Sequence, residues 1–360
     1  MNPRERYWAV LHGEVPDKVN VIAAEGLRYG PQGGWLRRLR ARGMGITHIV
    51  PPYKPMFFFD HRINPEIPDI IYSKTWFSEG RVQKIRHRFE TPVGTVDSIV
   101  ALNPDDNLLS KSPQTHFLKG EEDWRVINYI FQRMLDELRP NYQEMLLDQE
   151  DLGDSGYTIA VVDKTPYQRL WIEIAGVEQT VMDCKYRPEG FLEFIELQTR
   201  FHKRAAEITA GCPSDQVNII DNITNIISPR YYREFCLPIY QIYAEAFAGT
   251  NKKIAVHFDG LFGHLKNEIA ESPIDIIDSF TVPPTGNVSL TEARQLWPNK
   301  IPYVNLPPHL AHAPTETIFQ GYCEILAEWD SKLLTIEHVE DLPVQVLEKH
   351  LACALDVCGY

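Results

Sequence analysis

The segment from Ile254 to Pro284 constrains the fold of this chain more than any other stretch. It begins with a short apolar run, IAV, which ends in the polar sequence HFDG and is followed by a helical pattern of apolar residues. A second apolar run then ends at Phe280. Strand, turn, helix and strand in this order predict a βαβ unit, in which the two strands are parallel.

The same alternation of strand and helix covers most of the chain. We predict strands, close to eight in number, at 19–24, 46–50, 157–162, 217–221, 253–257, 275–280, 301–305 and 332–337. We predict helices at 3–12, 33–42, 122–135, 141–150, 166–174, 188–209, 228–247, 261–271, 289–296, 315–329 and 344–356. Strands that alternate with helices build a parallel sheet. A count near eight favours a closed (β/α)8 TIM barrel over an open sheet.

Residues from about 70 to 102 depart from this alternation. Short alternating runs are separated there by turn sequences, EG at 79–80 and PVG at 92–94, which predict antiparallel hairpins. The chain has 360 residues, more than the roughly 250 of a bare barrel. We therefore predict a single domain, residues 1–360, whose barrel carries an N-terminal extension and this hairpin insertion.

Composition and missing motifs exclude several classes of protein. The net charge of −13 argues against general binding to nucleic acid, which needs a basic face. No window reaches the roughly 20 apolar residues of a membrane span, and no long apolar stretch follows the first residues as in a signal peptide. The six cysteines form no CxxC pair, which favours reduced thiols and a cytoplasmic location. GxGxxG after a strand, GxxxxGK[ST] and GxSxG are all absent.

If the barrel forms, the polar residues at the carboxyl ends of its strands meet at one mouth, where such enzymes carry their chemistry. We predict three catalytic residues at these ends: Asp221, His257 and Asp259. We predict substrate contacts from Glu25, Tyr53, Asn222 and Asn305. One imidazole with carboxylates such as Asp221 and Glu337 or Glu340 can bind Zn²⁺ in an open site, or it can run acid–base chemistry without a metal.

Each of these residues also has a structural interpretation. Exposed carboxylates are usually solvated, and Asp259, which precedes Gly260, can cap the following helix. A lone histidine such as His257 is more often a hydrogen-bonded core residue than a ligand. We expect Asp163 and Asp278 to be structural.

Five stretches of the chain resemble the uroporphyrinogen decarboxylase superfamily, and in particular its corrinoid methyltransferase-like branch. They are NPRERYWAVLHGEVPDKVNV at 2–21, FETPVGTV at 89–96, IIDNITNIISPRYYREFCLPIY at 219–240, KIAVHFDG at 253–260, and PPTGNVSLTEARQLWPNKIPYVNLPPHL at 283–310. Each stretch is modestly specific, but their order over most of the chain is a strong signal. The resemblance implies a (β/α)8 barrel, in agreement with the strand and helix pattern.

The resemblance also implies a chemistry. Thiol-methylating members of that branch carry His-x-Cys and a later cysteine on zinc. This chain has His257-Phe258-Asp259 at that place and no cysteine between Glu337 and Glu340, so oxygen donors replace soft thiolates. The resemblance therefore implies a methyltransferase that demethylates an O-methyl compound, with zinc as Lewis acid. The expected ligands are His257, Glu337, Asp259, His338 and Glu340. The acceptor would be cob(I)alamin, a corrinoid carried by a partner protein.

Two other functions are compatible with the sequence. A decarboxylase acting on another carboxylated substrate would need cations in the mouth, for which Arg28, Arg37 and Lys54 are available. A non-catalytic binder of small molecules on the same scaffold is the third interpretation, since the barrel hosts many functions. The substrate is open, and so is the oligomeric state, a homodimer included.

Overall fold

The computed structural model describes residues 1–24, 34–57, 67–103, 111–329, 332–338 and 343–360. The chain divides into two compact units. We call the first the barrel unit; it comprises Met1–Pro52, Asn141–Val162 and Cys212–Tyr360. We call the second the hairpin unit; it comprises Tyr53–Pro140 and Asp163–Gly211. Among the described residues, no helix is long and apolar enough to cross a membrane.

A closed parallel barrel forms the centre of the barrel unit. Its strands are β1 (Asn20–Ala24), β2 (Gly45–Val50), β9 (Gly156–Val162), β10 (Gln216–Ile223), β11 (Lys253–Phe258), β12 (Ile276–Phe280), β13 (Ile301–Asn305) and β14 (Thr335–His338). Their order around the barrel is β1-β14-β13-β12-β11-β10-β9-β2, and every described pair is parallel. The predicted (β/α)8 TIM barrel is thereby confirmed.

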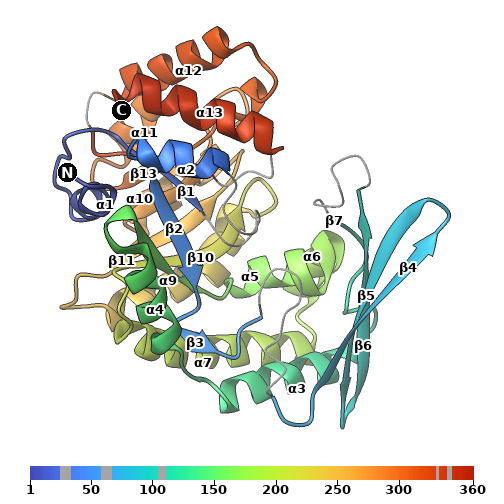
Figure 1. Ribbon diagram of the computed structural model, residues 1–360. Helices are drawn as coiled ribbons and strands as arrows, with labels where there is room; N and C mark the ends of the chain where they lie inside the picture. Colours follow the sequence, from blue (N-terminus) through green and yellow to red (C-terminus); the bar gives the residue numbers. More distant parts are fainter. Residues whose placement is uncertain (25–33, 58–66, 104–110, 330–331, 339–342) are drawn as a thin grey trace. The chain divides into compact units, whose positions relative to one another are not determined.

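Helices connect these strands (Figure 1). In the barrel unit they are α1 (Pro3–Leu11), α2 (Gly34–Ala41), α4 (Tyr142–Leu152), α8 (Pro229–Tyr231), α9 (Leu237–Ala246), α10 (Lys266–Glu271), α11 (Leu290–Leu296), α12 (Thr315–Glu328) and α13 (Val344–Val357). Because helices cover the outer face and side chains fill the inner one, β9 and β12 are buried at every position. The predicted helix at 228–247 does begin at Ser228, whose hydroxyl accepts a hydrogen bond from the Tyr231 amide. It is interrupted by a π-helical turn at Tyr232–Cys236.

Helix α1 is the N-terminal extension, and it packs against the amino-terminal ends of the strands. Asn2 caps it in a capping box: its side chain accepts from the Glu5 amide, and the Glu5 carboxylate accepts from the Asn2 amide, each at 2.8 Å. Tyr7 of α1 belongs to a buried cluster with Tyr157 of β9 and Tyr303 of β13. The Tyr7 and Tyr157 rings stack with centroids 4.2 Å apart. The helix thus supplies core side chains to the inside of the barrel.

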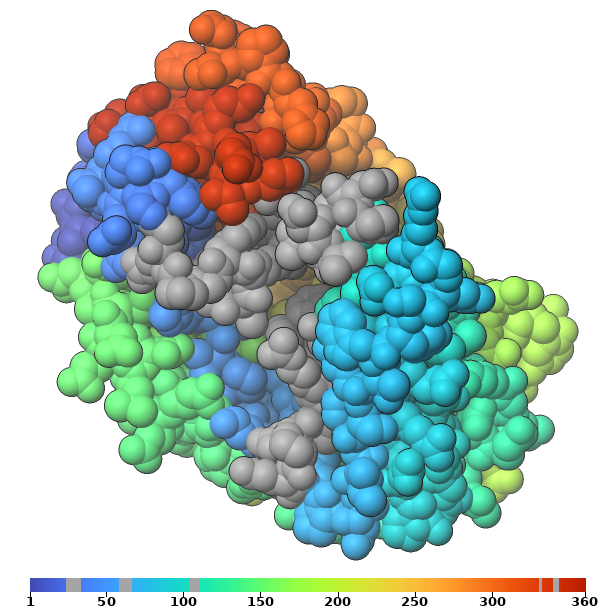
Figure 2. Space-filling model, turned by 45° about the vertical axis from the view of Figure 1, so that its right-hand side comes forward, coloured from blue at the N-terminus to red at the C-terminus, as the bar shows by residue number. Residues whose placement is uncertain are grey.

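The hairpin unit contains the predicted antiparallel insertion. Its strands are β3 (Tyr53–Lys54), β4 (Ile71–Glu79), β5 (Val82–Thr91), β6 (Gly94–Leu102), β7 (Lys111–Thr115) and β8 (Arg139–Pro140), and its helices are α3 (Asp123–Asp136), α5 (Pro166–Arg169), α6 (Gly176–Tyr186) and α7 (Glu189–Ala210). Strands β4 to β7 form one antiparallel sheet. The hairpin pattern at 70–102 predicted β4 to β6, whereas β3, β7, β8 and α6 were not predicted from the sequence. Much of β4 is solvent-exposed, including Trp76, and Figure 2 shows this hairpin in cyan at the surface.

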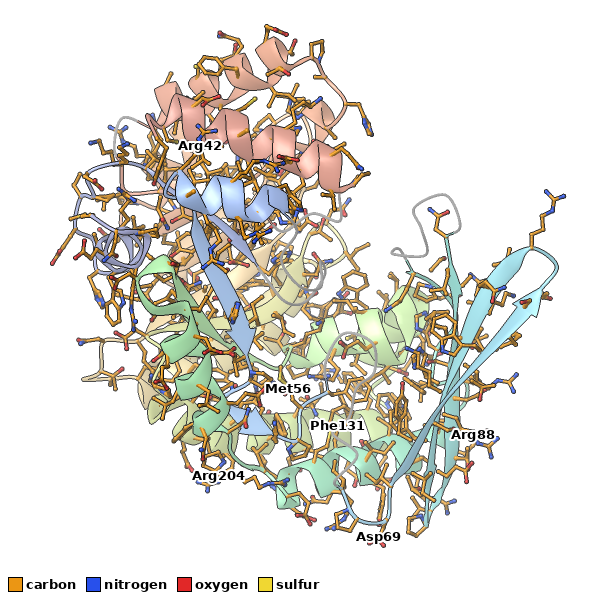
Figure 3. All side chains as sticks on the ribbon, viewed as in Figure 1. Arg42, Met56, Asp69, Arg88, Phe131 and Arg204 are labelled. Carbon is orange, nitrogen blue, oxygen red and sulfur yellow. The ribbon has the colours of Figure 1, made fainter. Side chains whose placement is uncertain are left out.

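Aromatic side chains fill the core of the hairpin unit. Phe131 of α3 lies within 5.5 Å of the Phe57 ring centroid, and Phe57 is in turn near Phe89 of β5. Figure 3 labels Phe131 and two arginines of this unit, Arg88 and Arg204. The side chains of both arginines are about half-exposed, and they form ion pairs with Glu90 and Glu207 on their own elements. The alternation of apolar and charged residues along β5 therefore separates a buried face from a solvated one.

A set of buried charges lies among these rings. Arg169 is fully buried and forms ion pairs with Asp163 and Glu173. Tyr53 donates to Asp163 at 3.0 Å, and His202 of α7 lies 3.1 Å from the carbonyl oxygen of Lys164. Burial, and then the positive charge of Arg169, lower the pKa of His202 to about 3. The imidazole is therefore neutral and can donate to that carbonyl.

This pKa predicts an acid-dependent loss of stability. The unfolded chain binds a proton at His202 near its usual pKa of about 6.5, whereas the folded chain does not, so stability decreases as pH falls below that value. His202→Gln keeps a donor for the Lys164 carbonyl but cannot be protonated. Between about pH 7 and pH 5, we expect the wild type to lose about 2 kcal/mol more unfolding free energy than His202→Gln. Urea titrations at several pH values measure this, and the exposed His312→Gln serves as control. Equal losses in wild type and His202→Gln would contradict it.

Candidate active site

Strands β11 and β12 place a histidine beside an aspartate. His257 and Asp278 are register partners on these adjacent parallel strands. Nδ1 of His257 lies 3.0 Å from Oδ2 of Asp278. The His257 side chain is 27% exposed and that of Asp278 only 8%, so the imidazole is the accessible member of the pair. A carboxylate acceptor favours the tautomer that carries a proton on Nδ1 and directs Nε2 away from Asp278.

Glu337 of β14 adds a second buried carboxylate to this site. Its Oε1 accepts a hydrogen bond of 2.6 Å from the amide of Ser279. Burial, and then the negative charge of Asp278, raise the pKa of Glu337 well above its usual range. Two carboxylates in a site of low dielectric constant repel each other when both are ionised. Glu337 therefore holds its proton to a higher pH than an exposed glutamate would.

The backbone of Ser279 is strained in a way that serves this contact. Its φ angle of 61° lies in the left-handed region although the residue is not glycine. The pairing of β12 with β13 is irregular between Ile277 and Phe280, where Ser279 lies. Such a conformation costs on the order of 1–3 kcal/mol and is typically retained at functional sites. Here it turns the Ser279 amide toward Glu337.

The two other predicted catalytic residues are in the barrel unit but make different contacts. Asp221 is buried, and its Oδ2 accepts a hydrogen bond of 2.6 Å from Tyr240 of α9, so it is bonded to the helix layer. Asp259 follows β11 directly, and its Oδ1 lies 3.4 Å from Oγ1 of Thr281. Among the described residues, the half-buried Asn222 presents a side-chain oxygen for which the structure gives no hydrogen-bond partner.

The remaining predicted site residues lie in both units or outside the described part of the chain. Asn305 and His338 are buried at the ends of β13 and β14, and Asn305 is the register partner of Glu337. Tyr53 is fully buried in the hairpin unit, where its hydroxyl is bonded to Asp163. Glu25 and Glu340 lie outside the described residues.

The predicted zinc site is not complete in the part of the chain that the structure describes. Within those residues, no group of three or more histidine, cysteine, aspartate or glutamate side chains is arranged to hold a metal ion. His257 and Glu337 are the predicted ligands that lie near Asp278, but Asp278 is itself bonded to His257. Glu340, one of the further predicted ligands, lies outside the described residues.

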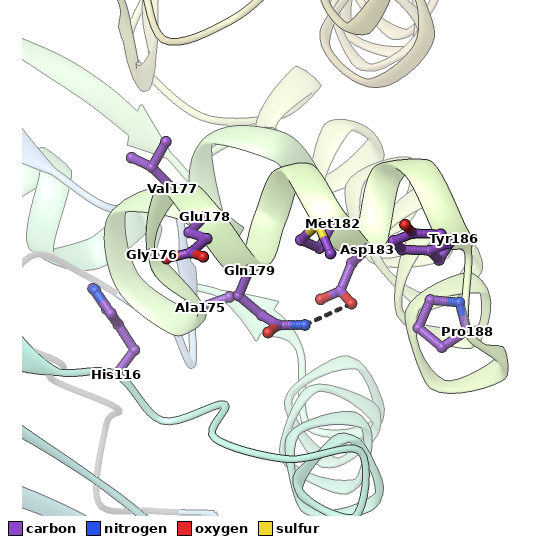
Figure 4. Close-up of a pocket in the computed structure, with 10 residues that line it drawn as sticks. All are labelled: His116, Ala175, Gly176, Val177, Glu178, Gln179, Met182, Asp183, Tyr186 and Pro188. Carbon is purple, nitrogen blue, oxygen red and sulfur yellow. Dashed lines mark hydrogen bonds between the residues drawn. The ribbon is translucent and has the colours of Figure 1, made fainter.

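A cavity of about 650 Å³ lies in the hairpin unit, along the length of α6 (Figure 4). His116, Gln179, Asp183 and Tyr186 are among its lining residues. Gln179 donates to Oδ1 of Asp183 at 2.9 Å, and burial raises the pKa of Asp183. The sequence analysis proposed none of these residues as functional. The cavity holds none of the strand-end groups described above, so we place the chemistry with His257.

Comparisons with known proteins support the family resemblance. Residues 172–332 match the family model "Uroporphyrinogen decarboxylase (URO-D)". The match covers β10 to β13, and thus His257 and Asp278, and confirms the resemblance for this part of the chain. The structure is similar to that of a methyltransferase from Methanosarcina mazei, with a TM-score of 0.58 and 12% identity over 99% of each chain. At that identity the similarity shows a shared fold. None of the curated proteins matches the sequence.

The structure assigns a larger role to Asp278 than the sequence analysis did. We expected Asp278 to be structural, but it is the hydrogen-bond partner of His257 and the charged neighbour of Glu337. Its position near the end of the buried strand β12, after Ile276 and Ile277, was the available signal. Strand pairing, which the sequence does not specify, was needed to see that it faces His257.

A variant of Glu337 tests whether burying this carboxyl group lowers the stability of the folded protein. Glu337→Gln retains an oxygen for the Ser279 amide but removes the buried acid. Because the folded-state pKa is raised, ionisation of Glu337 costs stability as pH rises above the usual carboxyl range. We expect Glu337→Gln to be more stable than wild type by about 1 kcal/mol or more at pH 8 and equal to it near pH 4.5. Thermal unfolding at both pH values measures the difference; the exposed Glu207→Gln is the control. A destabilised Glu337→Gln at pH 8 would refute the assignment.

Proposed function

We propose that this chain is a corrinoid-dependent methyltransferase that takes a methyl group from an O-methyl substrate and passes it to cob(I)alamin on a partner protein. The His257–Asp278 pair carries this proposal, because it places an oriented, partly accessible imidazole at the carboxyl end of a barrel strand. The match to the uroporphyrinogen decarboxylase family and the fold shared with a methyltransferase support it.

The proposed reaction transfers a methyl group from oxygen to cobalt and requires one proton for the leaving oxygen. The bond between oxygen and the methyl carbon breaks, and its electron pair remains on oxygen. Cob(I)alamin supplies both electrons of the new cobalt–carbon bond. The leaving oxygen takes a proton. In this proposal His257 delivers it from Nε2, while Asp278 stabilises the positive charge of the protonated ring. Glu337, buried beside Asp278, limits the negative charge of the site by keeping its own proton.

A decarboxylase is the second candidate, because the matched family is named for that activity. It would need cationic side chains to hold carboxylates. Of the cations considered from the sequence, Arg37 lies exposed on α2, Lys54 belongs to the hairpin unit and Arg28 is outside the described residues. Of these three, Arg37 is the one described in the barrel unit, and it lies on a helix rather than at a strand end, so we prefer methyl transfer.

Activity assays separate the two functions. We expect formation of methylcobalamin, followed by absorbance, when the protein is mixed with cob(I)alamin and a panel of aryl and alkyl methyl ethers. His257→Gln should lower the rate by at least about 100-fold, since general acid catalysis contributes 10²–10⁴-fold. His312→Gln, an exposed histidine, is the matched control. Release of carbon dioxide from carboxylated substrates, with no methylcobalamin formed, would replace this proposal by the decarboxylase.

Zinc is a separate part of the proposal. If bound, it would be held by His257 and Glu337 with a further donor from Asp259, His338 or Glu340. Its Lewis acidity would then stabilise the leaving oxygen in place of the proton from His257, because a metal-bound imidazole and carboxylate do not also carry those protons. We expect elemental analysis of protein purified without chelators to find about one zinc per chain, lost in His257→Ala. Absence of zinc from the active wild type would remove the metal and leave proton transfer as the chemistry of the site.

A further inference from the structure

A continuous line of polar side chains runs through the inside of the barrel and ends at His257. Its members are Tyr7 of α1, Tyr303 of β13, Gln216 and Asn218 of β10, Asp278 of β12 and His257 of β11. Tyr7 and Tyr303 both donate to Oε1 of Gln216, the latter at 3.0 Å. Gln216 Nε2 donates to Asn218 Oδ1 at 2.7 Å, and Asn218 Nδ2 donates to Asp278 Oδ1 at 3.1 Å. His257 Nδ1 completes the line on the other oxygen of Asp278.

The direction of every bond in this line is determined at the Asp278 end. A carboxylate oxygen accepts, so the Asn218 group that faces it is the nitrogen, and the Asn218 oxygen is left for the Gln216 nitrogen. The Gln216 oxygen is then the common acceptor for the two tyrosine hydroxyls. Burial raises the pKa of both hydroxyls, so they keep the protons that they donate. Reversing the amides would place the Asn218 oxygen against an oxygen of the Asp278 carboxylate, where neither atom carries a proton to donate.

The barrel geometry explains how Asn218 reaches Asp278. The two residues lie on strands β10 and β12, which are separated by β11. The register partner of Asn218 on β11 is Ala255. Ala255 belongs to the buried cluster of the barrel unit, and its side chain is a single methyl group. A larger residue at this position would separate the amide from the carboxylate.

The line is sealed from solvent at one end and accessible at the other. Tyr7, Tyr303 and Gln216 are at most 1% exposed and Asn218 is 8% exposed, whereas the His257 side chain is 27% exposed. Because a buried polar network is favourable only when its members are satisfied, loss of one member should affect the orientation of the next. The interior of a (β/α)8 barrel is usually filled by branched apolar residues, so this polar line needs a reason.

We propose that Gln216 and Asn218 are positioning residues, which hold the Asp278 carboxylate in the orientation that fixes the His257 ring with its proton on Nδ1. Tyr7 and Tyr303 anchor the line from the closed end of the barrel. The N-terminal helix α1 therefore contributes to the geometry of a site that lies at the opposite ends of the strands. The relevance to turnover rests on the proposed function, but the ring orientation is a property of the protein without substrate.

The orientation of His257 can be measured directly by NMR of protein labelled with ¹⁵N-histidine. We expect the wild type to show one protonated Nδ1 for His257, assigned by its loss in His257→Gln, with a downfield Nδ1 proton that exchanges slowly with water. In Asn218→Leu, a variant of similar size that lacks the donor, we expect this proton signal to disappear or the two tautomers to mix. An unchanged signal in folded Asn218→Leu would overturn the proposal.

A matched control separates positioning from simple loss of stability. Thr335→Val removes a different buried hydrogen bond, that of 3.2 Å with Asn20, from the inside of the same barrel. We expect it to lower the unfolding temperature while leaving the His257 signal unchanged. If Thr335→Val and Asn218→Leu affected the His257 signal equally, the effect would be general loosening of the barrel and the proposal would fail.

The double variant Tyr7→Phe/Tyr303→Phe covers the case in which Asn218→Leu does not fold. It retains both rings and removes both hydroxyl donors to Gln216. We expect a mixed His257 tautomer in the double variant and a wild-type signal in Tyr7→Phe alone, because Tyr303 still donates. A wild-type signal in the double variant would show that the tyrosines do not anchor the line.

Kinetics give a second readout once a substrate is found. Asn218→Leu should reduce kcat by about 10–100-fold, the usual effect of losing a residue that orients a reacting group. It should change KM by less than about threefold, since Asn218 does not contact substrate. The wild type and all variants could lack methyltransferase activity while their NMR signals follow the expected pattern. That result would reject the proposed function but retain the positioning role of Gln216 and Asn218.

Discussion

Two carboxylates buried at the carboxyl ends of barrel strands, Asp278 and Glu337, impose the main constraint on this structure. Neither can be ionised there without compensation. The Asp278 carboxylate is stabilised by hydrogen bonds from the Asn218 amide and the His257 ring. Glu337 accepts a hydrogen bond from the Ser279 amide, and its raised pKa means that it keeps its proton to a higher pH. The left-handed backbone of Ser279 is a further cost of this arrangement. Burying two carboxyl groups so close together and straining Ser279 both cost stability, which supports a chemical role for this site.

The hydrogen bonds that hold Asp278 extend to the other end of the barrel. The polar line through Asn218 and Gln216 ends on the hydroxyls of Tyr7 and Tyr303, which are held by stacking and edge contacts among aromatic rings. The N-terminal extension is therefore more than a cover for the barrel. It contributes an oriented donor to the interior, and so links the local structure of α1 to the surroundings of His257.

In the hairpin unit, the buried charges form ion pairs with one another. Two buried cations, Arg169 and Lys164, offset the carboxylates of Asp163 and Glu173. The set lies in an aromatic core, with the Phe57 and Phe131 ring centroids each within about 5.5 Å of the Arg169 guanidinium. Removing one member of such a set leaves an uncompensated buried charge, which is strongly destabilising. This agrees with the expectation that Asp163 is structural. In the barrel unit, by contrast, the charges end at a partly accessible imidazole.

The sequence by itself determined the strands, most of the helices and the class of fold, because apolar periodicity and turn residues are local properties of the chain. It also selected His257, which closes an apolar strand. It did not identify Asp278 as a partner 21 residues further on, nor the inward face that Gln216 and Asn218 share. Polar residues at alternate positions of β10 were a signal for that face. Only closure of the barrel decided the rest, since strand order and register, not spacing along the chain, bring Asn218, Asp278 and His257 into contact.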